Sequence, residues 1–474
     1  MINWGVSAGY HDASLSVVKD GQIVFAGHAE RYSRYKNDKH LNGFLIEDAL
    51  SHGEPDVVYW YENPLLKATR RIYSGQKNIW TNPKKYLIDH GYKPRKMKWG
   101  NHHRSHMAAG YYTRPFEDCA TLVIDAIGEW ITTSIWRDET MVWSKRYPNS
   151  LGLFYSAFTD RIGLKANEDE YILMGMAAYG DKHRFKEDLM KLVDDKTEFH
   201  RGVKWWKPEL KEEDYFDVAA SVQHMYESEL ASLLYFAGNL TKRKKLVFMG
   251  GCALNCLANR LIPVFFDDYW IMPNPGDAGS SLGAVLAGTE QRVEFETPYL
   301  GHKIEGEYPS EEILGELDRN GIVGVANGCA EFGPRALGNR SLLADPRGEF
   351  MKSKVNAIKK RQEFRPFAPV IREEDAHKCF NVSRGFSSPY MQEIVTCKDP
   401  EKYPAIVHKD GTSRVQTVNQ RQHSGLYEVL THWKHKTGCP MLLNTSLNIK
   451  GEPIVNDIND ANRFEKKYNV KVFK

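Results

Sequence analysis

Three histidines stand within five residues in the segment WGNHHRSHMAAGYY (99–112), and two of them have the spacing of a metal-binding pair. His102 and His106 are four residues apart, so on an α-helix both imidazoles lie on one face and can reach the same ion. Asn101 is a suitable N-cap for that helix. The spacing also fits polar residues on a solvated face, so a metal site needs further ligands from elsewhere in the chain.

Two aspartates can supply these ligands. Asp125 ends the apolar segment TLVID, and Asp277 lies in the turn NPGDAGSS. The alternative for each is a local role as the cap of its own turn. If both converge with the two histidines, the set suits a borderline divalent ion such as Fe(II), Mn(II) or Zn(II).

A histidine–aspartate pair lies near the first turn of the chain. His11 and Asp12 belong to the motif GYHDAS. A histidine in this position can act as a general base toward a hydroxyl, with its tautomer fixed by a neighbour. The alternative is a pair that only stabilises the turn.

The elements that must position these residues follow an α/β pattern. Residues 2–31 predict three strands joined by a glycine-containing turn and an Asp-Gly hairpin. A similar unit begins at CATLVIDAIGEWITTSIWRD (119–138). The repeated pattern predicts an internally duplicated α/β domain whose turns face one another across a cleft.

Two later segments each predict a strand, a glycine-rich turn and a helix. They are KLVFMGGCALNCLANRLI (245–262) and YWIMPNPGDAGSSLGAVLAG (269–288). Glycine-rich turns that open helices let backbone amides approach a phosphate or a nucleotide closely.

Length and composition limit the class of protein. A chain of 474 residues predicts two or three domains, and the polar Pro/Gly segment 294–310 predicts a boundary. No apolar run approaches the roughly 20 residues that span a bilayer, and the N-terminus does not read as a signal peptide, so we expect a cytoplasmic protein without a membrane segment. The seven cysteines are scattered, which is typical of free thiols in a reducing compartment.

Basic residues gather in two parts of the chain. Residues 65–104 hold eleven Lys and Arg, one acid and several aromatic residues. This composition favours contact with a nucleotide or nucleic acid, and the alternative is a solvated insertion. After residue 321, cations lie beside Gly, Pro, Ser and Asn in four motifs and predict an anion pocket. These cations are Arg335, Arg340, Lys359, Arg361, Arg365 and Arg414.

At these motifs the sequence resembles the O-carbamoyltransferases of the NodU/CmcH family. The resemblance covers essentially the whole chain and includes HDASLSVVKDGQIVFAGHAER, HHRSH, VIDAIGEW, GGCALN and NPGDAGSSLGA, followed by EFGPRALGNRSLLADPR, FRPFAPV and NTSLNIKGEPIV. It implies an α/β chain with an actin-like, sugar-kinase-related (ASKHA) duplicated domain at 1–300. It also implies a YrdC-like α/β domain at 301–474.

The resemblance implies a reaction in two steps. Carbamoyl phosphate and ATP, with Mg²⁺, would form carbamoyl adenylate in the YrdC-like domain. The carbamoyl group would then pass to an acceptor hydroxyl in the metal-bearing domain, where iron is the family's ion.

Residue roles follow from the same resemblance. The metal ligands would be His102, His106, Asp125 and Asp277. His11, beside Asp12, would be the base for the acceptor hydroxyl. The adenylate would bind at Gly250, Gly251 and Asn255. Carbamoyl phosphate and ATP would bind at Arg335, Lys359, Arg361, Arg414, Asn444 and Ser446.

The acceptor is left open by the sequence. The basic stretch borders the metal-ligand helix and favours a phosphate-bearing acceptor, such as a hydroxymethylated pyrimidine in a nucleotide or in DNA. The alternatives are a hydroxyl of a sugar or an antibiotic, a tRNA threonylcarbamoylation-type reaction, and a non-catalytic ATP- or nucleic-acid-binding protein. We expect small-molecule substrates and a homodimer.

Overall fold

The computed structural model describes residues 1–77, 79–194, 200 and 202–474. The chain forms two compact units. The first contains Met1–Ala29 and Asn37–Phe295, and the second contains Glu30–Lys36 and Glu296–Lys474. None of the helices in the described ranges is long and apolar enough to cross a membrane.

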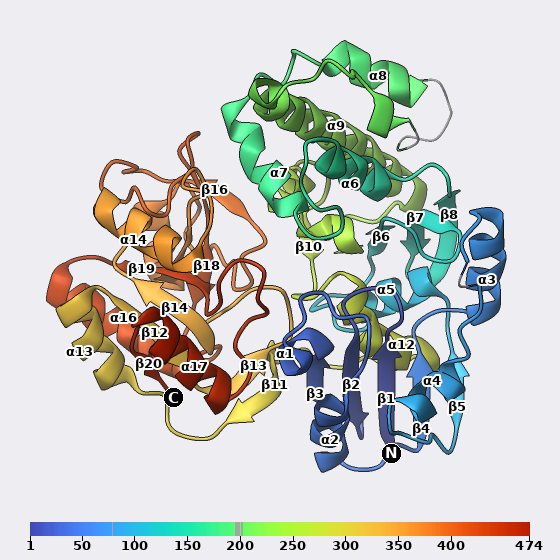
Figure 1. Ribbon diagram of the computed structural model, residues 1–474, viewed down its shortest axis with the longest axis horizontal. Helices are drawn as coiled ribbons and strands as arrows, with labels where there is room; N and C mark the ends of the chain where they lie inside the picture. The colour runs from blue at the N-terminus through green and yellow to red at the C-terminus, as the bar shows by residue number, and fades with distance from the viewer. Residues whose placement is uncertain (78, 195–199, 201) are drawn as a thin grey trace. The chain divides into compact units, whose positions relative to one another are not determined.

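The first unit contains two five-stranded sheets of the same topology (Figure 1). One sheet has the order β3-β2-β1-β4-β5 and the other β8-β7-β6-β9-β10. In each, the first three strands are antiparallel and the last two run parallel to the first. The strands of the first sheet are β1 (Ile2–Ser7), β2 (Ser14–Lys19), β3 (Gln22–His28), β4 (Val57–Trp60) and β5 (Met97–Trp99). Those of the second are β6 (Ala120–Ile124), β7 (Ile131–Arg137), β8 (Thr140–Arg146), β9 (Lys245–Met249) and β10 (Asp268–Trp270).

This repeated order confirms the predicted α/β class and the duplicated, actin-like first domain. The Asp20-Gly21 turn joins β2 to β3 as expected, and both of its residues have positive φ, which the primed hairpin turns require. The inner strands β1, β6 and β9 are almost fully buried, as their near-continuous apolar runs predict.

Two helices connect the sheets reciprocally. Helix α5 (His102–Tyr111) follows the first sheet in sequence but packs on β6 and β9 of the second. Helix α12 (Ser280–Thr289) follows the second sheet but packs on β1, β2 and β4 of the first. The two helices pack closely on each other, because Gly283 lies where a Cβ would stand 1.9 Å from the Ser105 carbonyl oxygen.

Other helices of the first unit pack on the first sheet or on one another. Helix α2 (Gly43–Ser51) packs on β2 and β3, and the long α9 (Tyr215–Thr241) packs with α6, α7 and α8. Figure 1 shows this group in green. The other helices are α3 (Pro64–Tyr73), α4 (Pro83–Asp89), α6 (Leu151–Arg161), α7 (Glu170–Met176), α8 (Lys186–Asp194), α10 (Cys256–Asn259) and α11 (Ile262–Phe265). Helix α1 (Ala29–Ser33) begins at the last residue of the first segment.

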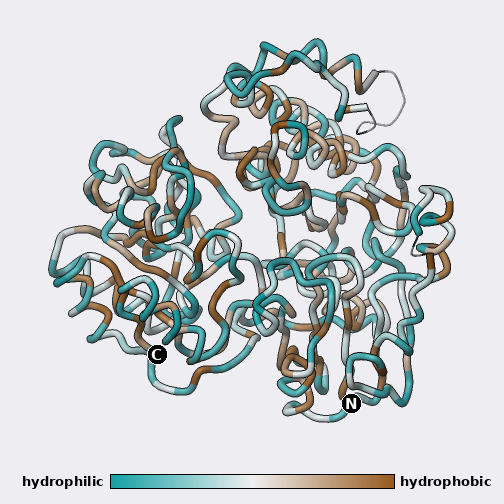
Figure 2. Tube along the Cα trace, in the orientation of Figure 1, coloured by the Kyte–Doolittle hydropathy of each residue, from teal (hydrophilic) through white to brown (hydrophobic). Residues whose placement is uncertain are grey.

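The second unit is built on a six-stranded mixed sheet of order β18-β15-β19-β14-β12-β20. Its core is a continuous cluster of buried aliphatic and aromatic side chains between this sheet and its helices, and Figure 2 shows the apolar strands in brown. The sheet strands are β12 (Ile322–Ala326), β14 (Arg340–Ala344), β15 (Ala368–Arg372), β18 (Gln416–Val418), β19 (Met441–Ser446) and β20 (Val472–Phe473). Two small ribbons pair β11 (Tyr299–Ile304) with β13 (Gly328–Glu331), and β16 (Ile394–Thr396) with β17 (Thr412–Arg414). The helices are α13 (Ser310–Asn320), α14 (Glu349–Lys359), α15 (Glu373–Cys379), α16 (Ser424–Thr437) and α17 (Ile458–Tyr468).

Candidate functional site

Helix α5 carries the two histidines of the predicted metal pair, and both are buried. Asn101 stands at the predicted N-cap position, but its side chain makes no capping hydrogen bond to a described residue. Glu129 takes that role instead: its Oε1 accepts hydrogen bonds from the backbone N–H of His102 (2.9 Å) and of Asn63 (2.7 Å). Glu129 was not among the predicted site residues, because nothing in its local sequence indicates a partner 27 residues away.

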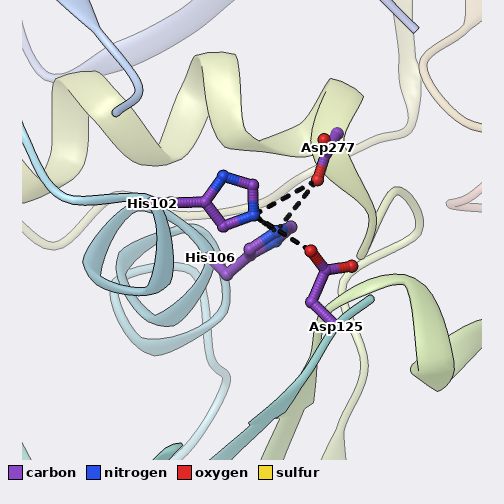
Figure 3. A group of neighbouring side chains, drawn as sticks. All are labelled: His102, His106, Asp125 and Asp277. Atoms are coloured by element: carbon purple, nitrogen blue, oxygen red, sulfur yellow. Dashed lines mark hydrogen bonds and ion pairs between the residues drawn. The ribbon is translucent and has the colours of Figure 1, made fainter. Parts of the chain in front are cut away.

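The four predicted ligands converge (Figure 3). One ligand atom from each of His102, His106, Asp125 and Asp277 lies within 4.8 Å of all the others. We call these four residues the tetrad. His102 Nε2 lies 3.1 Å from Asp125 Oδ2, and His106 Nε2 lies 3.2 Å from Asp277 Oδ1. A helix, the end of β6 and the turn before α12 therefore supply one compact set of two nitrogens and two oxygens.

Neighbouring groups orient the tetrad. His106 Nδ1 lies 3.1 Å from the Pro275 carbonyl oxygen, which can only accept, so Nδ1 carries a proton and Nε2 keeps its lone pair in the neutral ring. Asp125 Oδ1 accepts a hydrogen bond of 3.2 Å from the backbone N–H of Gly251. These contacts leave His106 Nε2 and Asp125 Oδ2 directed at the centre of the tetrad.

Burial and the neighbouring charges shift the pKa values of His102 and Asp125 in opposite directions. Burial lowers the pKa of His102, but Asp277 and Asp125 outweigh it and raise that pKa to about 9. Burial opposes ionisation of Asp125, but the hydrogen bond from His102 and the charges of the histidines hold its pKa well below the ordinary range. The carboxylates are thus ionised and attract positive charge to this position.

This donor set fits a divalent metal ion. Two imidazole nitrogens and two carboxylate oxygens are ligands of borderline divalent ions, and all four side chains are buried, so a cation there would be held away from water. His103 lies outside the set. Its Nδ1 is 2.8 Å from Ser134 Oγ, and burial, with the charges of His102 and His106, holds its pKa well below the usual value.

His11 lies at the edge of the tetrad. Its Nε2 is 3.6 Å from Asp277 Oδ2, and its Nδ1 is 2.9 Å from Asp12 Oδ2. Asp12 adopts a left-handed conformation with φ of 48°. The His11 side chain remains about a quarter exposed, so a reactant can reach this imidazole from solvent.

The glycine turn after β9 approaches the tetrad closely. Gly250 has φ of 92°, and a Cβ there would lie 2.2 Å from the Ile124 carbonyl oxygen. Asn255 caps α10 through its side chain, which accepts from Ala258 N, and it also bonds to Gln223. Gly250, Gly251 and Asn255 were expected at the adenylate, and this role stays a prediction.

In the second unit, a lysine from α14 meets the end of β19. Lys359 Nζ donates to the backbone oxygen of Ser446, to Ser446 Oγ at 3.1 Å and to Asn448 Oδ1 at 2.6 Å. Burial and the charges of Arg361 and Arg365 hold the pKa of Lys359 well below its usual value. Asn448 was not predicted, although it stands in the same NTSLN motif as Asn444 and Ser446.

The predicted anion-binding arginines differ in what they bind. Arg340 was expected in the anion pocket, but it is fully buried and donates to the carbonyls of residues 302, 327, 328, 339 and 456, so it is a structural residue. Arg361 donates to two carbonyls and stacks 4.1 Å from the Phe367 ring centroid. Arg335 and Arg414 are half-buried, and the buried Nε of Arg414 has no partner among the described residues.

Asn444 lies on β19, two residues before the Ser446 that Lys359 contacts. Its Nδ2 donates to the Ala336 carbonyl and, at 2.7 Å, to Gln416 Oε1. Its buried Oδ1 has no partner within the described ranges. The structure thus groups Lys359 with Ser446, while Asn444 is held by other partners.

The basic stretch 65–104 separates into two environments. Three of its cations on α3 are buried, whereas Lys98 and Arg104 line a surface pocket of about 360 Å³ with Tyr59, Asn63 and Trp99. Asn101, which precedes helix α5, also lines this pocket.

Comparison with known proteins gives matches in both units. Residues 69–286 match the carbamoyltransferase N-terminus and residues 315–473 match the carbamoyltransferase C-terminus. Among solved structures, a ROK family glucokinase from Streptomyces griseus aligns over 61% of this chain and 100% of its own, with 12% identity and a TM-score of 0.33.

Three curated relatives align over much of the chain. An uncharacterized protein of Synechocystis sp. is 32% identical over 97% of this chain and 93% of its own. The nodulation protein NolO of Bradyrhizobium diazoefficiens is 33% identical over 76% of this chain and 75% of its own. The 3'-hydroxymethylcephem-O-carbamoyltransferase of Amycolatopsis lactamdurans is 27% identical over 95% of this chain and 94% of its own. The chain belongs to the carbamoyltransferase family, of the NodU/CmcH type, and is an enzyme.

Proposed function

We propose that this enzyme is an ATP-dependent O-carbamoyltransferase. Carbamoyl phosphate is first hydrolysed: one water is consumed, the bond between the bridging oxygen and one of its two neighbouring atoms breaks, and carbamate and phosphate form. A carbamate oxygen then attacks the α-phosphorus of ATP, which forms carbamoyl adenylate and releases pyrophosphate. In the transfer step the acceptor hydroxyl oxygen bonds to the carbamoyl carbon, the bond from that carbon to the adenylate oxygen breaks, and AMP leaves.

The observation that carries the transfer step is the position of His11 beside the tetrad. Nδ1 of His11 is held by Asp12, so Nε2 is the atom that can take the proton of the acceptor hydroxyl. Its partial exposure gives the acceptor access to that atom. The tetrad would hold a divalent ion, with Fe(II) as the ion that the resemblance implies, and that ion would supply Lewis acidity to polarise the carbamoyl carbonyl.

The adenylation step is supported by the polar groups around Lys359. Its Nζ donates to Ser446 Oγ and is buried near the charges of Arg361 and Arg365, so a phosphate there would meet hydrogen-bond donors beside two guanidinium groups. We assign Lys359, Ser446 and Asn444, with Arg335, Arg361 and Arg414, to carbamoyl phosphate and ATP, with Mg²⁺ on the nucleotide. Gly250, Gly251 and Asn255 are assigned to the adenylate.

For the acceptor we propose a hydroxymethylated pyrimidine in a nucleotide or in DNA. Support comes from the pocket beside Asn101, whose volume falls in the range of small-molecule sites and whose lining combines Lys98 and Arg104 with the exposed indole of Trp99. A sugar or antibiotic hydroxyl is the second candidate, because the similar enzyme of Amycolatopsis lactamdurans is named for a hydroxymethyl acceptor on a cephem.

The test is incubation of the full chain with ATP, Mg²⁺, labelled carbamoyl phosphate and Fe(II). The acceptors are 5-hydroxymethyl-dCMP, hydroxymethylated DNA, an aminoglycoside, simple sugars and tRNA. We expect mass gain of one carbamoyl group on the pyrimidine, with AMP and pyrophosphate formed. Modification of a sugar or an antibiotic would move the acceptor to the second class, and modification of tRNA adenosine would replace the reaction type.

Two variants separate the half-reactions. Lys359→Met should abolish pyrophosphate release, while His106→Ala should stop transfer but keep adenylation. A wild-type enzyme that consumes no nucleotide with any acceptor would overturn the proposal.

A further inference from the structure

Helix α3 places three cations on its inner face, next to the candidate site of the first unit. Lys67, Arg70 and Arg71 are 4%, 5% and 8% exposed. Their spacing of three and four residues puts them on one side of the helix. Because burial of a charge without a partner is costly, each of these side chains requires a counter-charge.

Lys67 connects this face to the tetrad. Its Nζ lies 5.7 Å from the ring centroids of both Tyr10 and Tyr61. The Tyr10 ring lies 4.8 Å from that of His11, and the Tyr61 ring lies 5.4 Å from that of His102. One aromatic ring therefore separates the ammonium from the candidate base, and another separates it from a tetrad histidine.

The two arginines lie near the same tyrosine. Burial and Asp277 raise the pKa of Tyr10, whereas Arg70 and Arg71 lower it, so both guanidinium groups act on the Tyr10 hydroxyl. Helix α3 is also tied to the metal helix, because Glu129 accepts hydrogen bonds from the N–H groups of Asn63 and His102. The inner face of α3 is thus held in place relative to His11.

The three cations on this face differ in the partners of their side chains. Glu62 is buried and pairs with Lys67 at 2.6 Å. Arg71 donates to the neutral hydroxyl of Thr81 at 3.2 Å. The Arg70 side chain forms no salt bridge or hydrogen bond with any described residue, and its Nε is buried without a partner.

We propose that the inner face of α3, centred on Arg70, binds one phosphate group of a reactant at the tetrad. A guanidinium group presents paired N–H donors that match two phosphate oxygens, and a second arginine and a lysine stand within one helical turn. The inference rests on the proposed function, which supplies two phosphates: that of the adenylate and that of a nucleotide acceptor. The face would fix either reactant with its reacting group near His11.

The test measures binding, so it does not depend on turnover. Calorimetric titrations of the full chain use two matched pairs: AMP against adenosine, and 5-hydroxymethyl-dCMP against 5-hydroxymethyl-deoxycytidine. Arg70→Gln is compared with wild type, and Lys85→Gln is the control because Lys85 lies in the same basic stretch but is 72% exposed and pairs with Asp89.

In wild type we expect at least one phosphorylated ligand to have an affinity at least about tenfold higher than that of the matched nucleoside, as a charge-assisted bidentate contact predicts. Arg70→Gln should reduce that preference to about threefold or less, and Lys85→Gln should leave it unchanged. The pair that responds identifies the source of the phosphate. An unchanged preference in Arg70→Gln, or no preference in wild type for either pair, would overturn the inference.

Arg70→Lys covers the case in which Arg70→Gln does not fold. It keeps the charge but loses the paired donors, so the preference should fall by about three- to tenfold, and an unchanged preference would again overturn the inference. A phosphate preference in a protein that transfers no carbamoyl group would contradict the proposed function and leave this site standing.

Discussion

His102 Nε2 and His106 Nε2 lie 3.0 Å apart, and Asp277 Oδ1 lies within 3.5 Å of both. Two ring nitrogens at this distance cannot both keep free lone pairs without repulsion unless a proton or a cation lies between them. The proximity of the carboxylates raises the affinity of this point for positive charge. The arrangement thus explains why one site combines buried histidines with ionised aspartates.

Removal of one tetrad ligand should release the metal. For Asp277→Asn or His106→Ala we expect metal content to fall from roughly one ion per chain and affinity to fall by at least about 100-fold, since loss of outer contacts alone costs 10- to 100-fold. The measurement is elemental analysis after dialysis. His183→Gln, an exposed histidine remote from the tetrad in sequence, is the control, and metal retained by both tetrad variants would contradict the assignment.

His11→Gln should slow transfer without removing the metal. Loss of a general base costs about 10²- to 10⁴-fold in rate, so carbamoylation should fall within this range while pyrophosphate release continues. Rapid-quench measurement of product, with metal content determined in parallel, checks this. Loss of the metal together with activity would show instead that His11 acts by holding Asp277, which its Nε2 approaches to 3.6 Å.

Two helical glycines should respond in opposite directions to alanine. Gly283→Ala places a Cβ 1.9 Å from the Ser105 carbonyl, so α5 and α12 must separate, and we expect a loss of about 1–3 kcal/mol in the free energy of unfolding and weaker metal binding. Gly315→Ala in α13 meets only the flexible end of Arg319 at 3.6 Å and should stabilise by about 0.5–1 kcal/mol. Urea titrations measure both, and destabilisation of equal size would contradict the close packing.

Stability should fall on acidification because of His423. Its Nδ1 accepts from Leu426 N at 3.1 Å and so caps α16, while its Nε2 lies 2.8 Å from Asn339 Oδ1. Burial lowers the pKa of His423 to about 4. In the unfolded state the pKa of His423 is near 6.5, so the unfolded state binds more protons than the folded state between pH 4 and 6.5. The contribution of His423 to the free energy of unfolding is therefore complete above pH 6.5 and is lost as pH falls toward 4.

The loss amounts to about 3 kcal/mol over that interval. His423→Asn keeps a capping oxygen but does not titrate there, so its free energy of unfolding should depend on pH less steeply than that of wild type. Urea titrations at pH 7 and pH 5 measure the difference. Parallel pH dependence in the two proteins would show that the folded and unfolded states bind protons at His423 equally.

Patterns that are local in sequence were predictable. The Asp-Gly hairpin, the apolar strand before Asp125 and the four-residue spacing of His102 and His106 depend on neighbouring residues, and each is found as expected. Convergence of the four ligands was predictable only as a possibility, because it depends on how α5 and the turn at Asp277 pack.

Features set by distant contacts were missed or wrong. Glu129 receives its partners from two other elements, and the sequence around it carries no corresponding signal. Arg340 was predicted to bind an anion because of its motif, but the backbone carbonyls that surround it come from separate segments of the second unit. A cation next to Gly and Asn in the sequence can therefore donate to backbone carbonyls inside the fold as readily as it can line an anion pocket.

The seven residues Glu30–Lys36 belong to the second compact unit although they follow β3 of the first. Arg31 donates there to the Gly333 carbonyl, and Arg34 donates to the carbonyls of Pro453 and Ile454. If the gene were split at residue 295, the product with residues 296–474 would therefore lose the arginine donors to its Gly333, Pro453 and Ile454 carbonyls. Exchange of one half between relatives by recombination would separate these donors from their acceptors unless the short segment is transferred with residues 296–474.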